Sequence, residues 1–218
     1  MSEANADLAE PGRDCPLCPR LVAFRKANRA ANPDWFNAPV PSFGPASARL
    51  LIVGLAPGLK GANRTGRPFT GDYAGDLLYA TLKEFGFAKG EYRARPDDGF
   101  ELIDTRIANA VRCVPPENKP TNDEIRTCRA FLVSALNEMP NLIRVVALGR
   151  IAHDSVVVAL GSKISRHKFG HAMIHDFERV RLFDSYHCSR YNTNTGVLTP
   201  DMFREVFSNV RASFGAIA

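Results

Sequence analysis

The chain has 218 residues, 45% of them hydrophobic and 23% charged, which is ordinary composition for one globular domain. No apolar run approaches the roughly 20 residues that cross a bilayer, and the opening residues, MSEANADLAEPG, lack a basic start followed by an apolar core. We therefore expect neither membrane insertion nor secretion. The net charge of +5 permits binding to a polyanion without demonstrating it.

The apolar pattern predicts strands that alternate with helices. Residues 1–14 are polar and are expected to be a frayed N-terminus, followed by a single domain over residues 15–218. Strands are expected at 49–54, 107–111, 144–148 and 180–186, and helices at 74–85, 121–138, 151–160 and from 199 onward. The second helix opens on the capping box Thr121-Asn-Asp-Glu124, and the last opens on Thr199-Pro200. This alternation indicates an α/β fold with a mostly parallel sheet covered on both faces.

Unusual sequences lie where the predicted strands end. They are the loop after Gly54, the residues after Val111 and the loop after Tyr186. In sheets of this kind ligands bind beyond the carboxyl ends of the strands, where the loops converge. The sequence therefore predicts a functional site at this edge of the sheet.

The chain has five cysteines, an odd number that argues against a disulfide framework and for a reducing compartment such as the cytoplasm. Cys15-Pro-Leu-Cys18 is a C-x2-C pair, Cys113 follows a predicted strand, and Cys128 lies on the capped helix. Four thiolates of this kind suit zinc or a [4Fe–4S] cluster, and their spacing does not separate the two. The alternative is that they are buried free thiols. Cys188 is left over and is expected to be structural.

The loop that follows Gly54 runs to Asp72 and contains neither a Walker A motif nor G-x-G-x-x-G. Its glycines would let a ligand approach the backbone closely. Arg64 and Arg67 are candidates for phosphate contacts, and Phe69 is a candidate for stacking on a planar ring. The alternatives are solvated charges and a packed aromatic side chain.

Two further side chains have the chemistry of a site. Asn109 lies inside an apolar strand, where a buried amide must find hydrogen-bond partners or cost about 1–3 kcal/mol. An amide both donates and accepts, so Asn109 is suited to reading the edge of a nucleobase. His187 opens a loop rich in hydroxyl and amide groups, which suit phosphate contacts. A lone histidine is more often structural, but its place at a strand end favours function.

Three more histidines, His167, His171 and His175, are spaced four residues apart. On a helix this spacing would align three imidazoles for a metal ion. Gly170 interrupts the segment and no apolar stripe develops, so we expect neither a helix nor a metal site there.

Taken together, these segments resemble the uracil-DNA glycosylase superfamily, and most closely its family 5, the type b enzymes. The resemblance covers the chain from about Cys15 to the last helix, with four motifs in the same order at compatible spacings. The residues that carry it are Cys15-Pro-Leu-Cys18; Gly54-Leu-Ala-Pro-Gly58 with Asn63-Arg-Thr-Gly-Arg-Pro-Phe-Thr-Gly-Asp72; Asn109-Ala-Val-Arg-Cys113 with Pro115-Pro116, Asn118 and Cys128; and His187-Cys-Ser with Asn192-Thr-Asn-Thr-Gly196.

The resemblance implies a three-layer α/β/α sandwich around a four-stranded parallel sheet. It implies a structural [4Fe–4S] cluster, rather than zinc, bound by Cys15, Cys18, Cys113 and Cys128. The implied activity is excision of uracil, and of other deaminated bases such as hypoxanthine, from single- and double-stranded DNA in base excision repair. A monomer that works in the cytoplasm, at the nucleoid, with no membrane partner, is expected.

The resemblance also implies roles for individual residues. The catalytic set would be Asp72 near the sugar, Asn109 on the base edge, and His187 as a donor to the departing base. Phe69 would stack on the flipped base. The full set expected to contact substrate and DNA is Ala56, Gly58, Phe69, Ser189, Arg190 and Asn192.

The sequence departs from the pattern of related families at two places. Leu55-Ala56 stands where related glycosylases carry an acidic or amide side chain that activates water, which transfers that role to Asp72. Cys188 stands where proline is frequent after the histidine. The chain shows no lysine placed for a Schiff base, so base removal without strand cleavage is expected.

Other functions stay open at this point. One is a non-catalytic nucleic-acid-binding protein on the same scaffold, and another is an iron–sulfur electron-transfer protein. A relative that traps uracil covalently is a third, but the chain lacks the basic, histidine-containing insertion that such proteins carry after the first loop.

Overall fold

The computed structural model describes residues 10–215. Its centre is a five-stranded sheet with the spatial order β4-β1-β5-β7-β6. The first four strands run parallel, and β6 pairs antiparallel with β7 at one edge. A separate two-stranded ribbon joins β2 and β3. The strands are β1 (Leu50–Gly54), β2 (Ala88–Lys89), β3 (Glu101–Leu102), β4 (Thr105–Asn109), β5 (Arg144–Leu148), β6 (Ile174–Asp176) and β7 (Arg181–Ser185).

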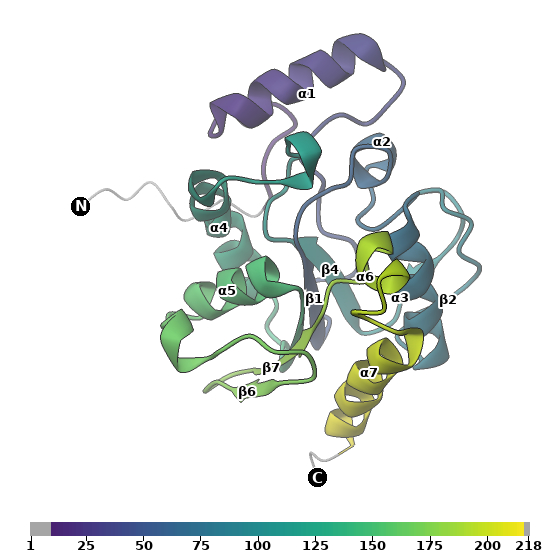
Figure 1. Ribbon diagram of the computed structural model, residues 1–218, viewed down its shortest axis with the longest axis vertical. Helices are drawn as coiled ribbons and strands as arrows, with labels where there is room; N and C mark the ends of the chain where they lie inside the picture. The colour runs from purple at the N-terminus through teal and green to yellow at the C-terminus, as the bar shows by residue number, and fades with distance from the viewer. Residues whose placement is uncertain (1–9, 216–218) are drawn as a thin grey trace.

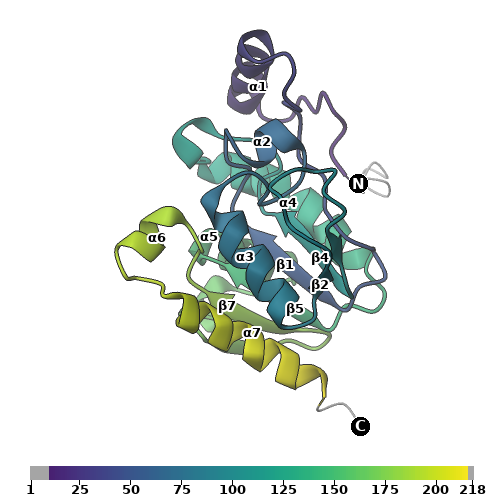
Figure 2. The ribbon, with the colours of Figure 1, turned by 90° about the vertical axis from the view of Figure 1, so that its right-hand side faces the viewer.

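Helices cover both faces of the sheet (Figures 1 and 2). The helices α3 (Tyr73–Glu84) and α7 (Pro200–Phe214) pack on one face, and α4 (Asn122–Asn137) and α5 (Arg150–Ala159) pack on the other. The expected three-layer α/β/α sandwich is therefore confirmed. The remaining elements are α1 (Pro19–Ala31), α2 (Ala62–Thr65), α6 (Arg190–Asn194) and the 3-10 turns η1 (Pro116–Asn118) and η2 (Ile164–Arg166).

The continuous apolar sequence of β1 explains the two cores. Successive side chains of a strand point to opposite faces, so Leu50 and Ile52 join the core under α3 and α7. Leu51 and Val53 join the core under α4 and α5. All five residues of β1 are buried, as a strand covered on both faces requires.

The structure corrects the expected four-stranded sheet by adding β6, and it adds α1 and α6, which the apolar pattern did not indicate. β6 has only three residues, two of them exposed, so it has no apolar run to detect. Both predicted caps are present, because the Thr121 and Thr199 hydroxyls accept hydrogen bonds from the backbone of α4 and α7. None of the helices within residues 10–215 combines the length and hydropathy that a membrane span requires.

Part of the segment that we expected to be frayed makes contacts with the body of the protein. Residues 1–9 of that prediction lie outside the described residues. Glu10 lies 3.1 Å from the buried guanidinium of Arg112, and Asp14 pairs with Arg29 of α1. Residues 10–14 thus connect α1 to the sheet.

Arg67 is held within the protein by a buried ion pair, and not at a phosphate site as the sequence suggested. Its guanidinium bonds both carboxylate oxygens of Asp98 at 2.8 Å. The Arg67 guanidinium also lies over the rings of Phe43, Tyr79 and Tyr92, at 5.2, 5.6 and 5.8 Å from their centroids. Only 6% of the Arg67 side chain and none of the Asp98 side chain is exposed. This pair fixes the loop between β1 and α3.

We predict that Asp98→Asn lowers the free energy of unfolding by about 3–5 kcal/mol, because it leaves the Arg67 cation buried without a counter-charge. Burial acts to raise the pKa of Asp98, but the hydrogen bond and charge of Arg67, together with hydrogen bonds from the Arg93 and Phe100 N–H groups, lower it overall. The native carboxylate therefore adds stability that is complete above about pH 4 and is lost as the pH falls further. Denaturant unfolding of the wild-type protein and of Asp98→Asn as a function of pH checks this. The free energy of unfolding of Asp98→Asn should lack the part that the wild-type protein loses below about pH 4.

Asp97→Asn is the matched control, because its pair with Arg95 is exposed and should contribute less than about 1 kcal/mol. The double variant Arg67→Met, Asp98→Asn should recover part of the loss, since no buried charge then remains. Equal stability of Asp98→Asn and Asp97→Asn would contradict the assigned role of the pair.

Candidate functional site

A cavity of about 1030 Å³ opens where the parallel strands end. Its walls include Leu55 after β1, Asn109 at the end of β4, Gly149 after β5 and His187 after β7. This is the edge of the sheet at which the sequence predicted a site. All nine residues expected to act on substrate or DNA line this cavity: Ala56, Gly58, Phe69, Asp72, Asn109, His187, Ser189, Arg190 and Asn192.

Gly54 lies beneath two of these side chains. In the parallel ladder it pairs with Asn109, the last residue of β4. A Cβ atom at Gly54 would lie 2.5 Å from both the Oδ1 of Asn109 and the Cζ of Phe69, closer than real contacts allow. The missing side chain is therefore what lets the amide and the ring meet at one place.

Asn109 is 2% exposed, yet its Oδ1 has no hydrogen-bond partner among the described residues. A buried acceptor without a donor costs about 1–3 kcal/mol, so native proteins rarely keep one without a use. Because Asn109 lines the cavity, an N–H group of a bound molecule can supply the donor.

Phe69 has a left-handed backbone conformation, with φ of 53°, that non-glycine residues seldom adopt. Tyr92 holds it there, because its hydroxyl donates to the Phe69 carbonyl at 3.2 Å and accepts from the Gly71 N–H at 3.2 Å. The Phe69 ring lies nearly parallel to the imidazole of His187, with 6.0 Å between centroids. The Phe69 ring is thus held in the wall of the cavity.

Asp72 caps the N-terminus of α3, where its Oδ1 accepts a hydrogen bond from the Gly75 N–H at 3.1 Å. Its second oxygen, Oδ2, faces the loop after β1. A Cβ atom at Gly58 would lie 3.1 Å from this oxygen, and one at Gly61 would clash with it. Burial raises the pKa of Asp72, and the charge of nearby Asp76 adds to the effect, although backbone N–H groups of α3 oppose it.

His187 lies two residues after β7, next to the half-buried Tyr186. Burial lowers its pKa to about 4, so its imidazole is neutral at pH 7 and retains one N–H to donate. Asn192 fixes its backbone, since the Asn192 Nδ2 donates to the His187 carbonyl at 2.8 Å. The following Cys188 is fully buried, and its thiol donates to the Ala74 carbonyl at 3.5 Å.

The short helix α6 shapes the mouth of the cavity. Ser189 caps it by accepting a hydrogen bond from the Asn192 N–H at 3.3 Å. Arg190 is exposed, and its guanidinium lies 5.4 Å from the ring centroid of Tyr73. The Arg190 cation thus lies over the Tyr73 ring in the lining of the cavity.

Asn118, which carries part of the resemblance but was given no role, also lines this cavity. The sequence did not single out five further residues of its wall: Lys60, Tyr73, Arg150, Phe169 and Tyr186. Tyr186 ends a predicted strand, so its position was a usable signal. Phe169 and Arg150 had none, because they come from an irregular loop and from an exposed position at the start of α5.

The four cysteines expected to bind a metal meet at a second, small cavity. Cys18 precedes α1, Cys113 follows β4, and Cys128 lies on α4, so the cavity joins α1 to the body. The sulfur of Cys113 accepts from Arg25 Nη1 at 3.5 Å, and that of Cys128 accepts from the Arg112 N–H at 3.2 Å. Ala56 packs against this cluster and also lines the large cavity.

The cysteine sulfurs are spread more widely than the ligands of one metal ion. Zinc at about 2.3 Å from four sulfurs would hold them about 3.8 Å apart. All four cysteines are among the described residues, and no three of their sulfurs lie within 4.8 Å of one another. Within residues 10–215, such a close group occurs only at His153, His175 and Asp184.

The expected absence of a helical histidine row is confirmed. His167 ends the turn η2, His171 lies in a turn and His175 lies in β6, so a helix does not align them. His175 contacts His153 and Asp184 instead, on the side of the sheet away from α3.

Comparison with known proteins agrees with this architecture. The sequence model described as "Uracil DNA glycosylase superfamily" matches residues 41–211. A protein of Thermus thermophilus named type-5 uracil-DNA glycosylase is 44% identical over 208 residues, covering 92% of this chain and 94% of the relative. Proteins of the same name are 38% identical in Pyrobaculum aerophilum, covering 94% and 91%, and 39% identical in Mycobacterium leprae, covering 99% and 96%.

These matches span the strands, the cavity loops and the last helix, and they agree with the resemblance noted from the motifs. The similarity extends to proteins named type-4 uracil-DNA glycosylase, at 30% identity. With the cavity at the carboxyl ends of its parallel strands and relatives of this kind along nearly its whole length, the chain belongs to the uracil-DNA glycosylase superfamily and is most similar to type-5 enzymes.

Proposed function

We propose that this protein removes uracil from DNA by hydrolysing the N-glycosidic bond, and that it acts on other deaminated bases such as hypoxanthine. The observation that carries the proposal is the convergence of Phe69, Asp72, Asn109 and His187 on one cavity. The relatives are named for uracil excision, which supports the same reaction here. The protein would act as a monomer on single- and double-stranded DNA in the cytoplasm, at the nucleoid.

Base recognition would depend on Asn109 and Phe69. Reaching the glycosidic bond requires the nucleotide to leave the duplex, at a cost of roughly a few kcal/mol. Uracil presents an N–H between two carbonyl groups, and the partnerless Oδ1 of Asn109 accepts from this N–H while the amide NH₂ donates to the neighbouring carbonyl. Phe69 stacks on the face of the base. Binding of uracil would thereby satisfy a buried acceptor that has no hydrogen-bond partner among residues 10–215.

Bond cleavage would depend on His187 and Asp72. As the bond between the base and the sugar breaks, its electron pair moves onto the base, and the neutral His187 donates a hydrogen bond to the uracil O2. The sugar becomes cationic, and the Asp72 carboxylate stabilises it and orients the water whose oxygen adds to the anomeric carbon. The water releases a proton, and the base anion takes one up. Fixed charges and donors of this kind supply the largest share of most enzymatic rate enhancement.

The other predicted residues would hold the DNA. Ser189, Arg190 and Asn192 lie together at α6, where hydroxyl, guanidinium and amide groups suit phosphate contacts. Ala56 and Gly58 are small residues of the loop after β1 and leave room for the nucleotide. Lys60 also lines the cavity, and we propose that it forms no Schiff base with the sugar, so that the base is removed without strand cleavage.

Cys15, Cys18, Cys113 and Cys128 would hold a [4Fe–4S] cluster. The donor set consists of thiols alone, which suits zinc or iron–sulfur groups. All four cysteines line one small cavity, which supports a group that they share. The Arg25 and Arg112 donors would stabilise the thiolate charge. Such a cluster would tie α1 to the loops that line the substrate cavity.

The proposed activity is tested with an oligonucleotide that carries one uracil. Incubation with the protein and then alkali should cut the strand at the uracil, whereas omission of alkali should leave it intact. Asn109→Ala should lower the rate by orders of magnitude because it removes the acceptor and donor for the base. Asn209→Ala, an exposed position on α7, is the matched control and should retain the wild-type rate. A wild-type protein that binds the oligonucleotide without removing the base would support the non-catalytic alternative.

The raised pKa of Asp72 predicts the acid side of the pH profile. Stabilising a cation requires the carboxylate, so kcat/KM should fall at acid pH with a midpoint above the ordinary aspartate value of 3.8. Asp76→Asn should move this midpoint to lower pH, since the Asp76 charge helps to raise the pKa of Asp72. Asp72→Asn should be slow at every pH. Full activity in Asp72→Asn would contradict its role.

The proposed cluster predicts a brown protein that contains iron and acid-labile sulfide. Cys113→Ser and Cys128→Ser should each lose the colour and the iron, because serine is a poor ligand for an iron–sulfur group. Cys188→Ser is the matched control and should keep both, since Cys188 does not line the cysteine cavity. A colourless wild-type protein with one bound zinc would overturn the cluster assignment.

A further inference from the structure

The cavity extends beyond the residues proposed to hold one base. At about 1030 Å³ it is at the upper end of the roughly 300–1,000 Å³ that drug-sized ligands occupy, far more than one pyrimidine ring fills. The extra space lies beside β5 and β7, where Arg150, Phe169 and Tyr186 form the wall. The proposed chemistry uses none of these three residues.

These three side chains form an aromatic surface with a cation at its edge. The ring centroids of Phe169 and Tyr186 are 6.1 Å apart, and the guanidinium of Arg150 lies 5.4 Å from the Phe169 centroid. All three line the cavity and are partly or fully exposed, and the imidazole of His171 covers one face of the Tyr186 ring at 5.0 Å between centroids. Aromatic rings with a neighbouring arginine are a typical platform for single-stranded nucleic acid, because every base offers a π-face.

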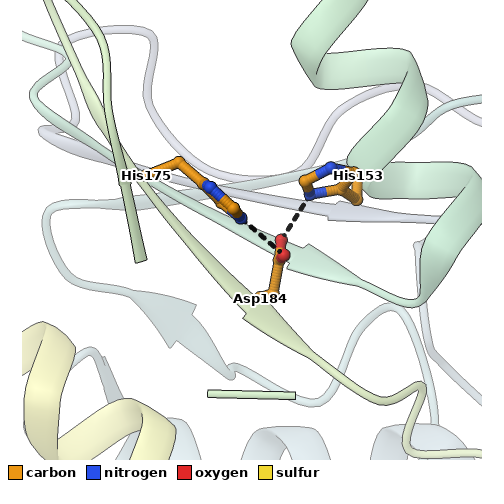
Figure 3. Close-up of side chains that lie close together, drawn as sticks. All are labelled: His153, His175 and Asp184. Carbon is orange, nitrogen blue, oxygen red and sulfur yellow. Dashed lines mark hydrogen bonds and ion pairs between the residues drawn. The ribbon is translucent and has the colours of Figure 1, made fainter. Parts of the chain in front are cut away.

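A buried group of charged side chains fixes the loop that carries Phe169. Figure 3 shows His153 of α5 and His175 of β6 pointing at the carboxylate of Asp184 on β7. The distances are 2.7 Å from His153 Nδ1 to Asp184 Oδ1, and 3.0 Å from His175 Nε2 to Asp184 Oδ2. We call these three residues the His–Asp–His anchor.

The His–Asp–His anchor binds the backbone on both sides of Phe169. His153 Nε2 lies 2.8 Å from the carbonyl of His167, and the Gly170 N–H donates to Asp184 at 3.4 Å. The His153 ring also meets the Phe169 ring edge-on, with 5.6 Å between centroids. These contacts of His153 and Asp184 therefore hold the Phe169 ring in place, although its loop has no regular secondary structure.

The anchor is better described as an ion pair than as a metal site. Both ring nitrogens of His153 face oxygens that only accept, one of Asp184 and one of the His167 carbonyl, so both carry a proton. Burial would lower the pKa of His153, but the hydrogen bond and charge of Asp184 raise it overall. An imidazolium has no lone pair for a metal ion, so the group serves to hold the loop in place.

We propose that Phe169, with Tyr186 and Arg150, is a stacking subsite for the base next to the flipped nucleotide in single-stranded DNA. The inference rests on the proposed function, because it takes the first base to occupy the region of Phe69 and Asn109. The subsite is continuous with that region within one cavity. Single-stranded DNA is the expected occupant because its neighbouring base is free, whereas in a duplex that base stays paired and stacked.

Phe169→Leu tests the subsite by removing the ring while keeping an apolar side chain. On a single-stranded uracil oligonucleotide, KM should rise roughly 5- to 100-fold, as expected for loss of one stacked base, with a smaller change in kcat. On the matching duplex KM should rise much less. Phe169→Trp should retain most of the single-strand affinity, since it restores a ring.

A second experiment keeps the Phe169 ring and removes the neighbouring DNA base. Two single-stranded substrates carry an abasic analogue immediately 5′ or 3′ of the uracil. For one of them, wild-type KM should rise to that of Phe169→Leu, and the variant should show no further loss. Phe177→Leu is the matched control, because Phe177 stacks on His167 at 4.4 Å and does not line the cavity. It should leave KM unchanged on all substrates.

The outcomes separate the two proposals. The subsite is overturned, and the proposed function stands, if the wild-type protein excises uracil and Phe169→Leu has an unaltered KM. The same holds if the KM of Phe169→Leu rises by the same factor on every substrate. If the wild-type protein removes no base from any oligonucleotide, both are overturned. The subsite is supported if the KM difference between Phe169→Leu and the wild-type protein disappears on a substrate with one abasic neighbour.

Discussion

The site depends on one position where the sheet carries no side chain. Gly54 ends β1 beside Asn109, and the amide of Asn109 and the ring of Phe69 both occupy the space that a Cβ there would need. Strand register places the amide, because Gly54 and Asn109 are partners in a parallel ladder. The loop after β1 then returns over the strand and brings Phe69 to the same point. A stacking face and a hydrogen-bonding edge are thereby set together by backbone geometry.

The groups around this point are held in states that cost stability. The buried Oδ1 of Asn109 has no donor within the described part of the chain, and burial raises the pKa of Asp72 and lowers that of His187. Burial disfavours an unpaired acceptor, a carboxylate and an imidazolium, and the three groups suit the proposed substrate, which supplies an N–H, a developing cation and a developing anion. Strain and unpaired groups of this kind persist where the surroundings are rigid. Here the sheet and the two apolar cores supply that rigidity.

Sequence patterns predicted the elements whose signals are local. The apolar runs of β1 and β5 and the capping box at Thr121 gave the sheet and its covering helices. Asn109 and His187, which both line the cavity, were singled out because polar side chains at strand ends are conspicuous. The predicted phosphate contact of Arg67 was wrong. Arg67 pairs with Asp98, 31 positions away, and such a pairing leaves no mark on the local sequence. Phe169 was missed for the same reason, since its place depends on contacts from three separate elements.

Both aromatic walls of the cavity are held in place by buried ion pairs. Arg67 and Asp98 fix the loop that carries Phe69, and the His–Asp–His anchor fixes the loop that carries Phe169. Apolar packing alone is non-directional and tolerates small rotations of a loop. Hydrogen-bonded charges impose both distance and angle, and a misplaced loop would leave a charge buried and unpaired at a cost of several kcal/mol. The two loops are irregular in sequence and backbone, so this penalty for misplacement gives each ring a single position in the cavity wall.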